Sequence, residues 1–143
     1  MLYVKANNDT VIKYPYTIGN LRQDNPGWCF PKDPSSECLV DFGAYKVQNT
    51  PSPEYNAHIE KLVENVELVD GVWTQTWVVE NLPQELAEKN IRNERYRLLM
   101  QSDWRALNDQ TLSPEWSAYR QALRDIPQQA GFPYSVNWPT EPS

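Results

Sequence analysis

Few residues of this chain suit metal binding or nucleophilic catalysis. Its 143 residues include one histidine, His58, and two cysteines, Cys29 and Cys38. A structural zinc site takes four ligands drawn largely from these two residue types, and a nucleophilic triad needs a histidine within a motif. The five glycines lie far apart, so there is no glycine-rich phosphate loop. We therefore expect no catalytic residue, no cofactor and no metal, and a protein that is not an enzyme.

Long apolar runs and an excess of positive charge are also missing. No apolar segment approaches the ~20 residues of a membrane-spanning helix, and polar residues follow Met1-Leu2-Tyr3 at once, which argues against a signal peptide. The formal net charge is −6 and the sequence pI is ≈ 4.8, values that disfavour binding to nucleic-acid phosphates. We expect a cytoplasmic protein with neither nucleic acid nor membrane as partner. Its cysteines should be reduced, although whether they approach each other stays open.

Residues 1–48 carry the turn and cap signals of short elements. Asn7-Asn8-Asp9 favours a turn, because these side chains tolerate positive φ and form local hydrogen bonds. Thr17 and Ser35 or Ser36 are suitable helix N-caps, and Gly43 is a helix C-terminal signal. The sequence predicts a hairpin over residues 1–14 that Pro15 ends, a helical turn over 19–22, a helix ending at 42 and a strand over 44–48.

The strongest hairpin signal follows the proline-rich connection at residues 50–53. Asp70-Gly71 suits a two-residue type I′ turn between residues 59–69 and 72–80. If Val69 pairs with Val72, alternation places a set of large apolar side chains on one face of the hairpin. That predicted core face carries Val66, Leu68, Trp73 and Trp77.

The second half opens with a predicted helix from residue 84 to about 101. Pro83 suits its start. Its first half presents only a thin apolar stripe, Ala87 and Ile91. Its second half is apolar around most of the circumference, so we expect it to make contacts on more than one side. The residues responsible are Tyr96, Leu98, Leu99 and Met100.

Another helix is predicted from residue 114 to about 125. Ser113 is a good N-cap, Pro114 suits the first helical position, and the chain must leave the helix before Pro127. Apolar residues three and four positions apart form a stripe that has to be buried. They are Trp116, Tyr119, Leu123 and Ile126.

Residues 127–143 form what we call the aromatic tail, in which recurrent prolines forbid helix. Its apolar residues alternate with polar residues or proline, the period of an extended segment with one apolar face. They are Phe132, Tyr134, Val136 and Trp138. Large side chains are costly to leave in water, at ~1.5–3 kcal/mol each, so we expect this face to be covered by something.

Together these patterns predict an α+β fold in two domains. Residues 1–82 should form a small β-rich domain of hairpins with short helices, and residues 83–143 a helical hairpin with an extended aromatic tail. The acidity lies mostly in the first domain, which has six Lys/Arg against eleven Asp/Glu.

Charged residues that could suggest chemistry have simpler explanations. A lone histidine beside an acidic strand, such as His58, is usually just exposed. Acidic pairs could serve a glycosidase, but a solvated surface explains them better; they are Glu64 with Glu67 and Asp103 with Asp109. A small basic patch is offset by acidic neighbours; it consists of Arg92, Arg95 and Arg97.

The aromatic residues divide into two groups. Those within the predicted stripes should be core: Trp73, Trp77 and Trp116. Those close to prolines or polar loops are candidate anchors for a partner or a sugar ring: Trp28, Trp104, Tyr134 and Trp138.

Residues 102–142 resemble the phage tail assembly chaperone family, also called tail fibre assembly proteins. The likeness is carried by Ser102-Asp103-Trp104, Trp116, Tyr119-Arg120-Gln121, Leu123-Arg124-Asp125-Ile126-Pro127, Gly131-Phe132-Pro133 and Trp138-Pro139. The resemblance implies a non-enzymatic protein that binds a trimeric tail fibre protein, assists its folding, trimerisation or attachment, and in some cases remains on it. The candidate partner-binding residues are Trp104, Trp116, Tyr119, Arg120, Phe132, Tyr134 and Trp138.

Two functions remain open. One is an assembly chaperone that acts on the tail fibre in the host cytoplasm. The other is a structural component of the virion at the tail fibre or baseplate, including a receptor- or carbohydrate-binding tip that uses the same aromatic residues as stacking platforms.

Overall fold

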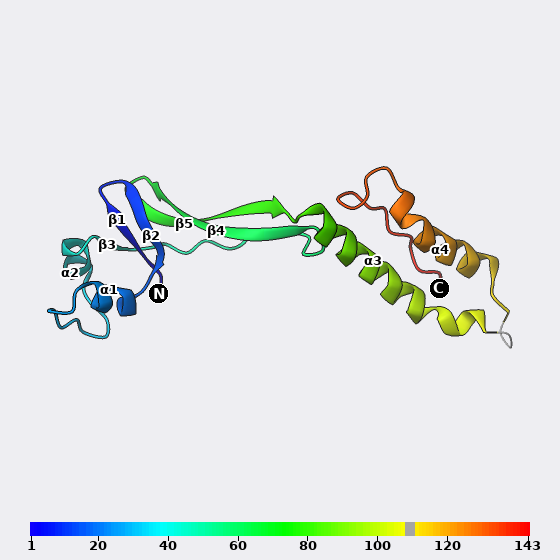
Figure 1. Cartoon of the computed structure of the whole chain (residues 1–143), viewed down its shortest axis with the longest axis horizontal. Coiled ribbons are helices and arrows are strands. Elements are labelled where there is room, and N and C mark those ends of the chain that lie inside the picture. Colours follow the sequence, from blue (N-terminus) through cyan, green and yellow to red (C-terminus); the bar gives the residue numbers. More distant parts are fainter. Residues whose placement is uncertain (108–110) are drawn as a thin grey trace. The chain divides into compact units, whose positions relative to one another are not determined.

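A computed structural model describes residues 1–107 and 111–143 of the chain. Asp109, one of the acidic residues considered above, lies outside the described residues. The contacts divide the chain into two compact units. Unit 1 comprises residues 1–54 and 62–78, and unit 2 comprises residues 55–61 and 79–143. Unit 1 contains small sheets and short helices and unit 2 contains mainly helices, which confirms the α+β class (Figure 1).

The sheet of unit 1 has three antiparallel strands in the order β2-β1-β3. They are β1 (Tyr3–Asn7), β2 (Thr10–Tyr16) and β3 (Ala44–Lys46). The predicted first hairpin is confirmed, with Asn8 at φ 53° in its turn. The expectation that Pro15 ends the second strand is wrong, because β2 continues to Tyr16. Proline is tolerated there because β2 is an edge strand and its register shifts between the pairs Tyr3–Tyr16 and Lys5–Lys13, which marks a bulge.

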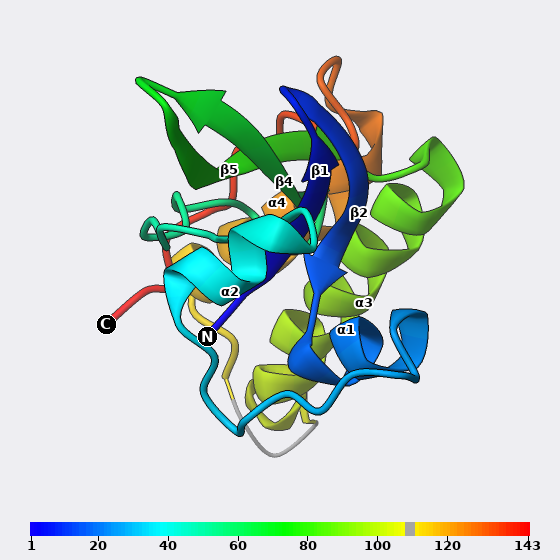
Figure 2. The same cartoon turned by 90° about the vertical axis from the view of Figure 1, so that its left-hand side faces the viewer.

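Two short helices cover one face of this sheet (Figure 2). They are α1 (Ile18–Asp24) and α2 (Ser36–Asp41). Thr17 caps α1 in a capping box, and the hydroxyl of Ser35 accepts a hydrogen bond from the Cys38 N–H at the start of α2. Both caps were predicted. The core between helices and sheet consists of Tyr3, Tyr16, Leu21, Phe30, Leu39 and Ala44.

The opposite face of the sheet packs against a two-stranded ribbon, β4 (Glu60–Val69) and β5 (Val72–Asn81). Its turn has positive φ at Asp70 (49°) and Gly71 (78°), as a type I′ turn requires. The second core joins Trp73 of β5 to buried residues of the sheet: Val4, Ala6 and Val47. Val66 and Trp73 point to this core as predicted, whereas Leu68, two residues from the turn, is 37% exposed.

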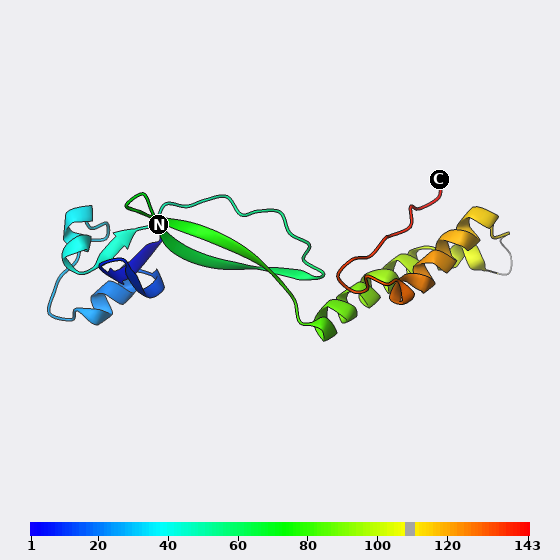
Figure 3. The same cartoon turned by 90° about the horizontal axis from the view of Figure 1, so that it is seen from above.

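Unit 2 is a helical hairpin, as predicted. It contains α3 (Gln84–Gln101), the 3₁₀-helix η1 (Asp103–Ala106), α4 (Pro114–Asp125) and the 3₁₀-helix η2 (Ile126–Gln128). Figures 1 and 3 show α3 and α4 side by side, with the aromatic tail running back beside α4. Its core contains the whole predicted stripe of α4 together with one residue of α3: Ile91, Trp116, Tyr119, Leu123 and Ile126.

The aromatic tail is not extended throughout, which corrects the sequence-based expectation. The Phe132 N–H donates to the Gln129 carbonyl (3.1 Å) and the Ser135 N–H to the Gly131 carbonyl (2.7 Å), so residues 129–135 form consecutive turns. The strict alternation is lost as a result. Pro133, expected to face away from the core, is buried, and Tyr134 is exposed. The backbone bonds within this segment are local, whereas an extended strand needs a neighbouring strand that the helices do not supply.

Candidate partner-binding surface

An exposed apolar stripe follows α3 and η1 at intervals of three or four residues. It consists of Tyr96 (63% exposed), Met100 (54%), Trp104 (53%) and Leu107 (56%). Tyr96 and Met100 share one face of α3, because they lie one turn apart. Ile91, by contrast, is 2% exposed and packs against α4 and the tail. In the part of unit 2 that the structure describes, the second half of α3 is therefore covered on one side. We call the four residues the exposed stripe.

Trp104 lies in a stack with two residues of the same unit. The guanidinium carbon of Arg105 is 4.3 Å from the ring centroid of Trp104 and 3.9 Å from that of Trp116. A guanidinium over an indole face is attracted by the ring quadrupole. Trp116 is buried in the core, so the stack fixes the more exposed Trp104 to the start of α4. The exposed stripe thus includes an aromatic side chain held in a defined place.

Arg120 of α4 donates hydrogen bonds to the C-terminal end of α3 from within unit 2. Its guanidinium donates to the Leu99 carbonyl (3.0 Å), the Ser102 hydroxyl (2.6 Å) and a carboxylate oxygen of Asp103 (2.8 Å). The residue is 8% exposed. The last carbonyls of a helix have no partner within the helix, so a buried cation is well placed there. Arg120 connects α4 to the end of α3 and offers little surface to a partner.

Trp116 and Tyr119 also belong to the interior. Each is 6% exposed, and their rings meet edge to face with centroids 5.6 Å apart. Burial raises the pKa of Tyr119 above its ordinary value. These two candidates and Arg120 build the helix pair, and contact between any of them and a partner stays a prediction.

The aromatic tail is attached to the helix pair through its apolar side chains. Phe132, Val136 and Trp138 are half-buried against the core of unit 2, and Arg92 lies 5.3 Å from the Phe132 ring centroid. Tyr134 is 37% exposed. Most of the tail's apolar area is thus sheltered within the unit, and the larger exposed area lies on the stripe.

Polar groups hold the tail in place as well. The Gln129 side chain forms two hydrogen bonds with the Asn137 backbone, one to the carbonyl (2.9 Å) and one from the N–H (2.8 Å). The Tyr134 hydroxyl donates to the Leu82 carbonyl (2.7 Å). The tail is therefore fastened at several points, which limits how far it can leave the helices without breaking bonds.

Two of the three arginines in the predicted basic patch are paired along the helix, and Arg95 forms no ion pair with the described residues. Arg92 pairs with Glu88 (2.9 Å), and the Arg97 Nε donates to Glu94 (2.8 Å). Hydrogen bonds from Arg97 hold the pKa of the Glu94 carboxyl below its usual range. The charges of Arg92 and Arg97 in the predicted basic patch are thus offset by acidic neighbours.

Other sequence candidates lie apart from this surface. The His58 N–H donates to the Asn56 side chain, and the His58 carbonyl accepts from Asn90. Cys29 is exposed, Cys38 is half-buried, and both are free thiols. Among residues 1–107 and 111–143, no group of three or more His, Cys, Asp or Glu side chains is placed to hold a metal ion. No helix in the same part of the chain is long and apolar enough to span a membrane.

Three residues of the stripe were absent from the partner-binding candidates: Tyr96, Met100 and Leu107. The signal that could have found the first two was present, because the second half of α3 is apolar around most of its circumference. Among the described residues of unit 2, α4 is the one α-helix that packs along α3, and Tyr96 and Met100 are exposed.

Unit 2 is thus a helix pair with an exposed apolar stripe and a tail fastened to its core. Residues 88–143 match the family model described as phage tail assembly chaperone protein. This match confirms the resemblance seen in the motifs and supports a role in phage tail assembly. A search of curated proteins found no match, and a search of solved structures found none either.

Proposed function

We propose that the chain is an assembly chaperone of the phage tail fibre. It binds the fibre polypeptide without a nucleotide and assists its folding, trimerisation or attachment in the host cytoplasm. Residues 83–143 supply the fibre contact, and residues 1–82 form the second domain of the proposed arrangement. This proposal makes the chain a stoichiometric binding partner.

The observation that carries the proposal is the place of the exposed stripe. Tyr96, Met100, Trp104 and Leu107 all lie within the residues that match the chaperone family model. Covering a large apolar side chain is worth ~1.5–3 kcal/mol, and tryptophan and tyrosine recur among the residues that dominate binding energy. A partner that covers the stripe would complete the second side of α3, as the all-round apolar pattern predicts.

The tail residues have a supporting part in this proposal. Tyr134 contributes an exposed ring, whereas Phe132 and Trp138 present the edges of half-buried rings. Trp116, Tyr119 and Arg120 act through the helix pair, because they hold α4 and the end of α3 together.

Co-expression with the fibre polypeptide of the same phage tests the proposal. The double variant Tyr96→Ser with Met100→Ser should reduce the amount of co-purified fibre at least tenfold, equivalent to about 1.4 kcal/mol or more. Its thermal stability should change little, because both side chains are exposed and surface substitutions usually cost within ~0.5 kcal/mol.

Leu86→Ser is the matched control. Leu86 is 43% exposed on the same helix but lies outside the residues matched by the family model, so the variant should retain the fibre. Undiminished fibre recovery by the folded double variant would exclude the stripe as the contact. A soluble, trimeric fibre made in the absence of this chain would remove the chaperone role.

Mass spectrometry of purified particles separates the two functions left open by the sequence. A transient chaperone should be missing from the particles. A component that remains on the fibre should be present in fixed ratio to it.

A further inference from the structure

A small pocket lies beside Trp104 at the start of α4. Its volume is ≈ 220 Å³, below the ~300–1,000 Å³ of typical small-molecule sites, so its size suits a single side chain of a partner. Trp104 belongs both to this pocket and to the exposed stripe. All of the lining residues lie within the residues that match the family model: Trp104, Arg105, Thr111, Leu112, Ser113 and Trp116. We call this space the Arg105 pocket.

Arg105 is held in place by two aromatic rings. Its guanidinium carbon lies 4.3 Å from the ring centroid of Trp104 and 3.9 Å from that of Trp116, and Trp116 is a buried core residue. A guanidinium stacks on aromatic rings through its flat faces, whereas its five N–H donors lie in its plane. The stack therefore fixes the position of the charge and leaves N–H donors for an acceptor.

The charge of Arg105 has no counter-ion within residues 1–107 and 111–143, because Arg105 forms no ion pair there. The two carboxylates that directly precede the tryptophans are engaged elsewhere. Asp103 accepts a hydrogen bond from Arg120 (2.8 Å). The pKa of the Glu115 carboxyl is held below its ordinary value by hydrogen bonds from its own backbone N–H and from Ser113. Arg105 is half-buried and always charged, so an acceptor that carries negative charge would complement it.

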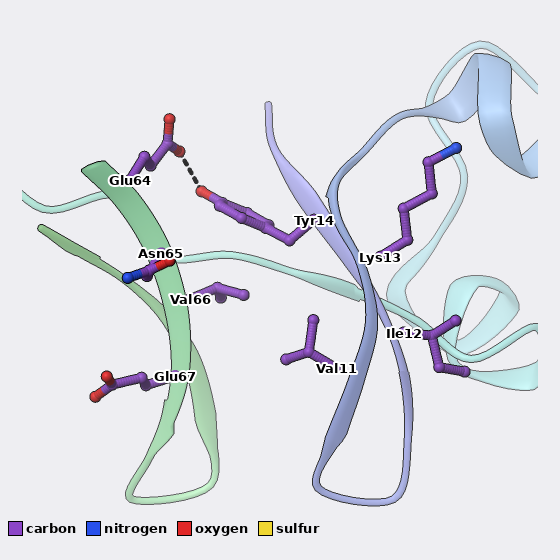
Figure 4. Close-up of a pocket in the computed structure, with 8 residues that line it drawn as sticks. All are labelled: Val11, Ile12, Lys13, Tyr14, Glu64, Asn65, Val66 and Glu67. Carbon is purple, nitrogen blue, oxygen red and sulfur yellow. Dashed lines mark hydrogen bonds between the residues drawn. The ribbon is translucent and has the colours of Figure 1, made fainter. Parts of the chain in front are cut away.

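A hollow in unit 1 shows the contrasting case (Figure 4). It lies between β2 and β4, where the Tyr14 hydroxyl donates to the Glu64 carboxylate. The same carboxylate also accepts from the Gln75 side chain (2.7 Å). The carboxylate in that hollow is thus bonded by its neighbours, whereas the guanidinium of the Arg105 pocket has no ion-pair partner among the described residues.

We propose that the Arg105 pocket binds an aspartate or glutamate side chain of the phage tail protein. The inference rests on the proposed function, because the carboxylate belongs to the tail protein that the chain binds. The fork of an arginine matches a carboxylate with two parallel N–H···O bonds. Thr111, whose hydroxyl is a further donor, lines the same pocket. The chain has a formal net charge of −6, so an arginine held beside the stripe determines where an acidic residue of the partner is attracted.

The pocket and the exposed stripe together define the bound segment. Its apolar residues cover Tyr96 and Met100, and an acidic residue next to them enters the pocket beside Trp104. The stripe supplies most of the binding energy through burial of apolar area, and the charge pair fixes the register of the segment.

The substitution Arg105→Gln tests the proposal in the full-length chain. It removes the charge and the fork, and we expect it to weaken binding of the purified fibre polypeptide of the same phage by about tenfold at low salt. Arg105→Lys keeps the charge without the fork and should lie between the two. Arg124→Gln is the matched control. It makes the same change of charge on the exposed side of α4, within the matched residues, and should bind within about twofold of the unsubstituted chain.

Salt distinguishes a charge pair with the fibre from a stack that only supports the fold. Binding by the unsubstituted chain should weaken as salt rises, and binding by Arg105→Gln should change less. A loss of binding that is independent of salt and accompanied by a lower melting temperature would assign Arg105 to the fold alone and overturn the proposal. Asp109, outside the described residues, is tested by Asp109→Asn. A loss equal to that of Arg105→Gln would assign the counter-ion to this chain and overturn the proposal as well.

Substitutions in the fibre supply a readout that leaves this chain unchanged. Its aspartate and glutamate residues are replaced one at a time by the corresponding amides. One replacement should weaken binding to the unsubstituted chain and have no further effect on binding to Arg105→Gln, as expected for two residues that act as a pair. If the fibre binds and no acidic residue behaves in this way, the carboxylate site is wrong while the proposed function stands. If the fibre does not bind the unsubstituted chain at all, the proposed function fails first.

Discussion

The two units expose different parts of the chain because one surface is built from strands and the other from a helix. In unit 1 the exposed feature is backbone, since β2 and β4 each have an edge without a ladder partner among the residues that the structure describes. In unit 2 the exposed feature is side chain, since α3 satisfies its backbone internally and leaves Tyr96 and Met100 uncovered. A strand edge suits a partner segment that is extended, whereas an apolar helix face suits a partner with a complementary apolar surface. The comparison therefore separates two kinds of uncovered surface in one chain.

The units also differ in how their helices are closed. In unit 1, Thr17 and Ser35 each bond a backbone N–H three residues away. Unit 2 has local closures too, at Ser113 for the start of α4 and at Ser102 for the end of α3, but the end of α3 is also closed by Arg120, which lies 21 residues from Leu99 and 18 from Ser102. Local caps fix individual helices, whereas Arg120 couples the end of one helix to the packing of the next. Unit 2 should consequently unfold more cooperatively than unit 1.

The largest expected effect tests whether the two units unfold independently of each other. Leu123 is fully buried in unit 2, and Leu123→Ala should cost ~3–4 kcal/mol, as large cavities in a core do. Leu39→Ala is the counterpart in unit 1, at 1% exposure. Measured by hydrogen exchange, each variant should lose protection in its own unit only. Equal loss in both units would show that the chain unfolds as one cooperative body.

The next largest effect tests the contrast in helix closure. Arg120→Ala should destabilise unit 2 by about 2–3 kcal/mol, because it removes the charged donor to the Leu99 carbonyl, the Ser102 hydroxyl and Asp103; the Leu99 carbonyl keeps its bonds from the N–H and hydroxyl of Ser102. Arg124→Ala, on the exposed side of α4, should cost less than ~0.5 kcal/mol. Urea unfolding of both variants measures the difference. Similar midpoints for Arg120→Ala and Arg124→Ala would mean that water replaces the buried donor without cost.

The same contrast explains which parts of the structure the sequence could predict. Both hairpin turns, the caps at Thr17, Ser35 and Ser113, and the bounds of α3 and α4 follow from residues close to one another in the chain. The buried stripe of α4 follows from helical periodicity in the same way. The family resemblance also rested on short local motifs, and the match to residues 88–143 confirms it.

Features that depend on distant residues were missed. Arg120 carries no local signal of its bonds to the end of α3. In the tail, alternation predicted an extended segment, but the Gly131 carbonyl accepts from Ser135 and the chain turns instead. The continuation of β2 through Pro15 depends on its place at the edge of a sheet, which is a property of the sheet and not of the strand. The exposed stripe depends on how many helices surround α3.

A smaller effect tests the turns of the tail. A Cβ on Gly131 would lie 2.5 Å from the Ser135 carbonyl oxygen, which is far inside van der Waals contact. Gly131→Ala should therefore cost about 1–3 kcal/mol, the usual range for added atoms in a packed site, and should raise the exposure of Trp138. Tryptophan fluorescence and thermal unfolding report both changes. Gly27→Ala in unit 1, where a Cβ meets nothing within 4 Å, should be nearly neutral. If Gly131→Ala is neutral too, the tail can rearrange at no cost, and the close packing at Gly131 does not determine its turns.

The smallest effect concerns the carboxylate of Asp24 in unit 1, which is hydrogen-bonded to the buried Tyr16. Asp24 accepts hydrogen bonds from Lys5 (2.6 Å) and from the Tyr16 hydroxyl (2.8 Å), and these partners, Lys5 foremost, hold the pKa of its carboxyl below the ordinary 3.8. A depressed pKa in the folded state means that the ionised carboxylate stabilises folding above pH 3.8 and that this stabilisation is lost as the pH falls through the folded value.

Asp24→Asn should accordingly lower the melting temperature slightly at pH 7, and the difference from the unsubstituted protein should vanish in acid below the folded pKa. Because Asp24 is exposed, added salt should shrink the difference at pH 7 as well. Thermal unfolding is measured with and without salt at pH 7 and at steps of falling pH, until the difference between the two proteins stops changing. A difference that persists at low pH and in salt would mean that Asp24 acts through the geometry of its bond to Tyr16. In that case unit 1 would depend on a distant side-chain contact just as unit 2 depends on Arg120, and the contrast between local and distant closure would no longer hold.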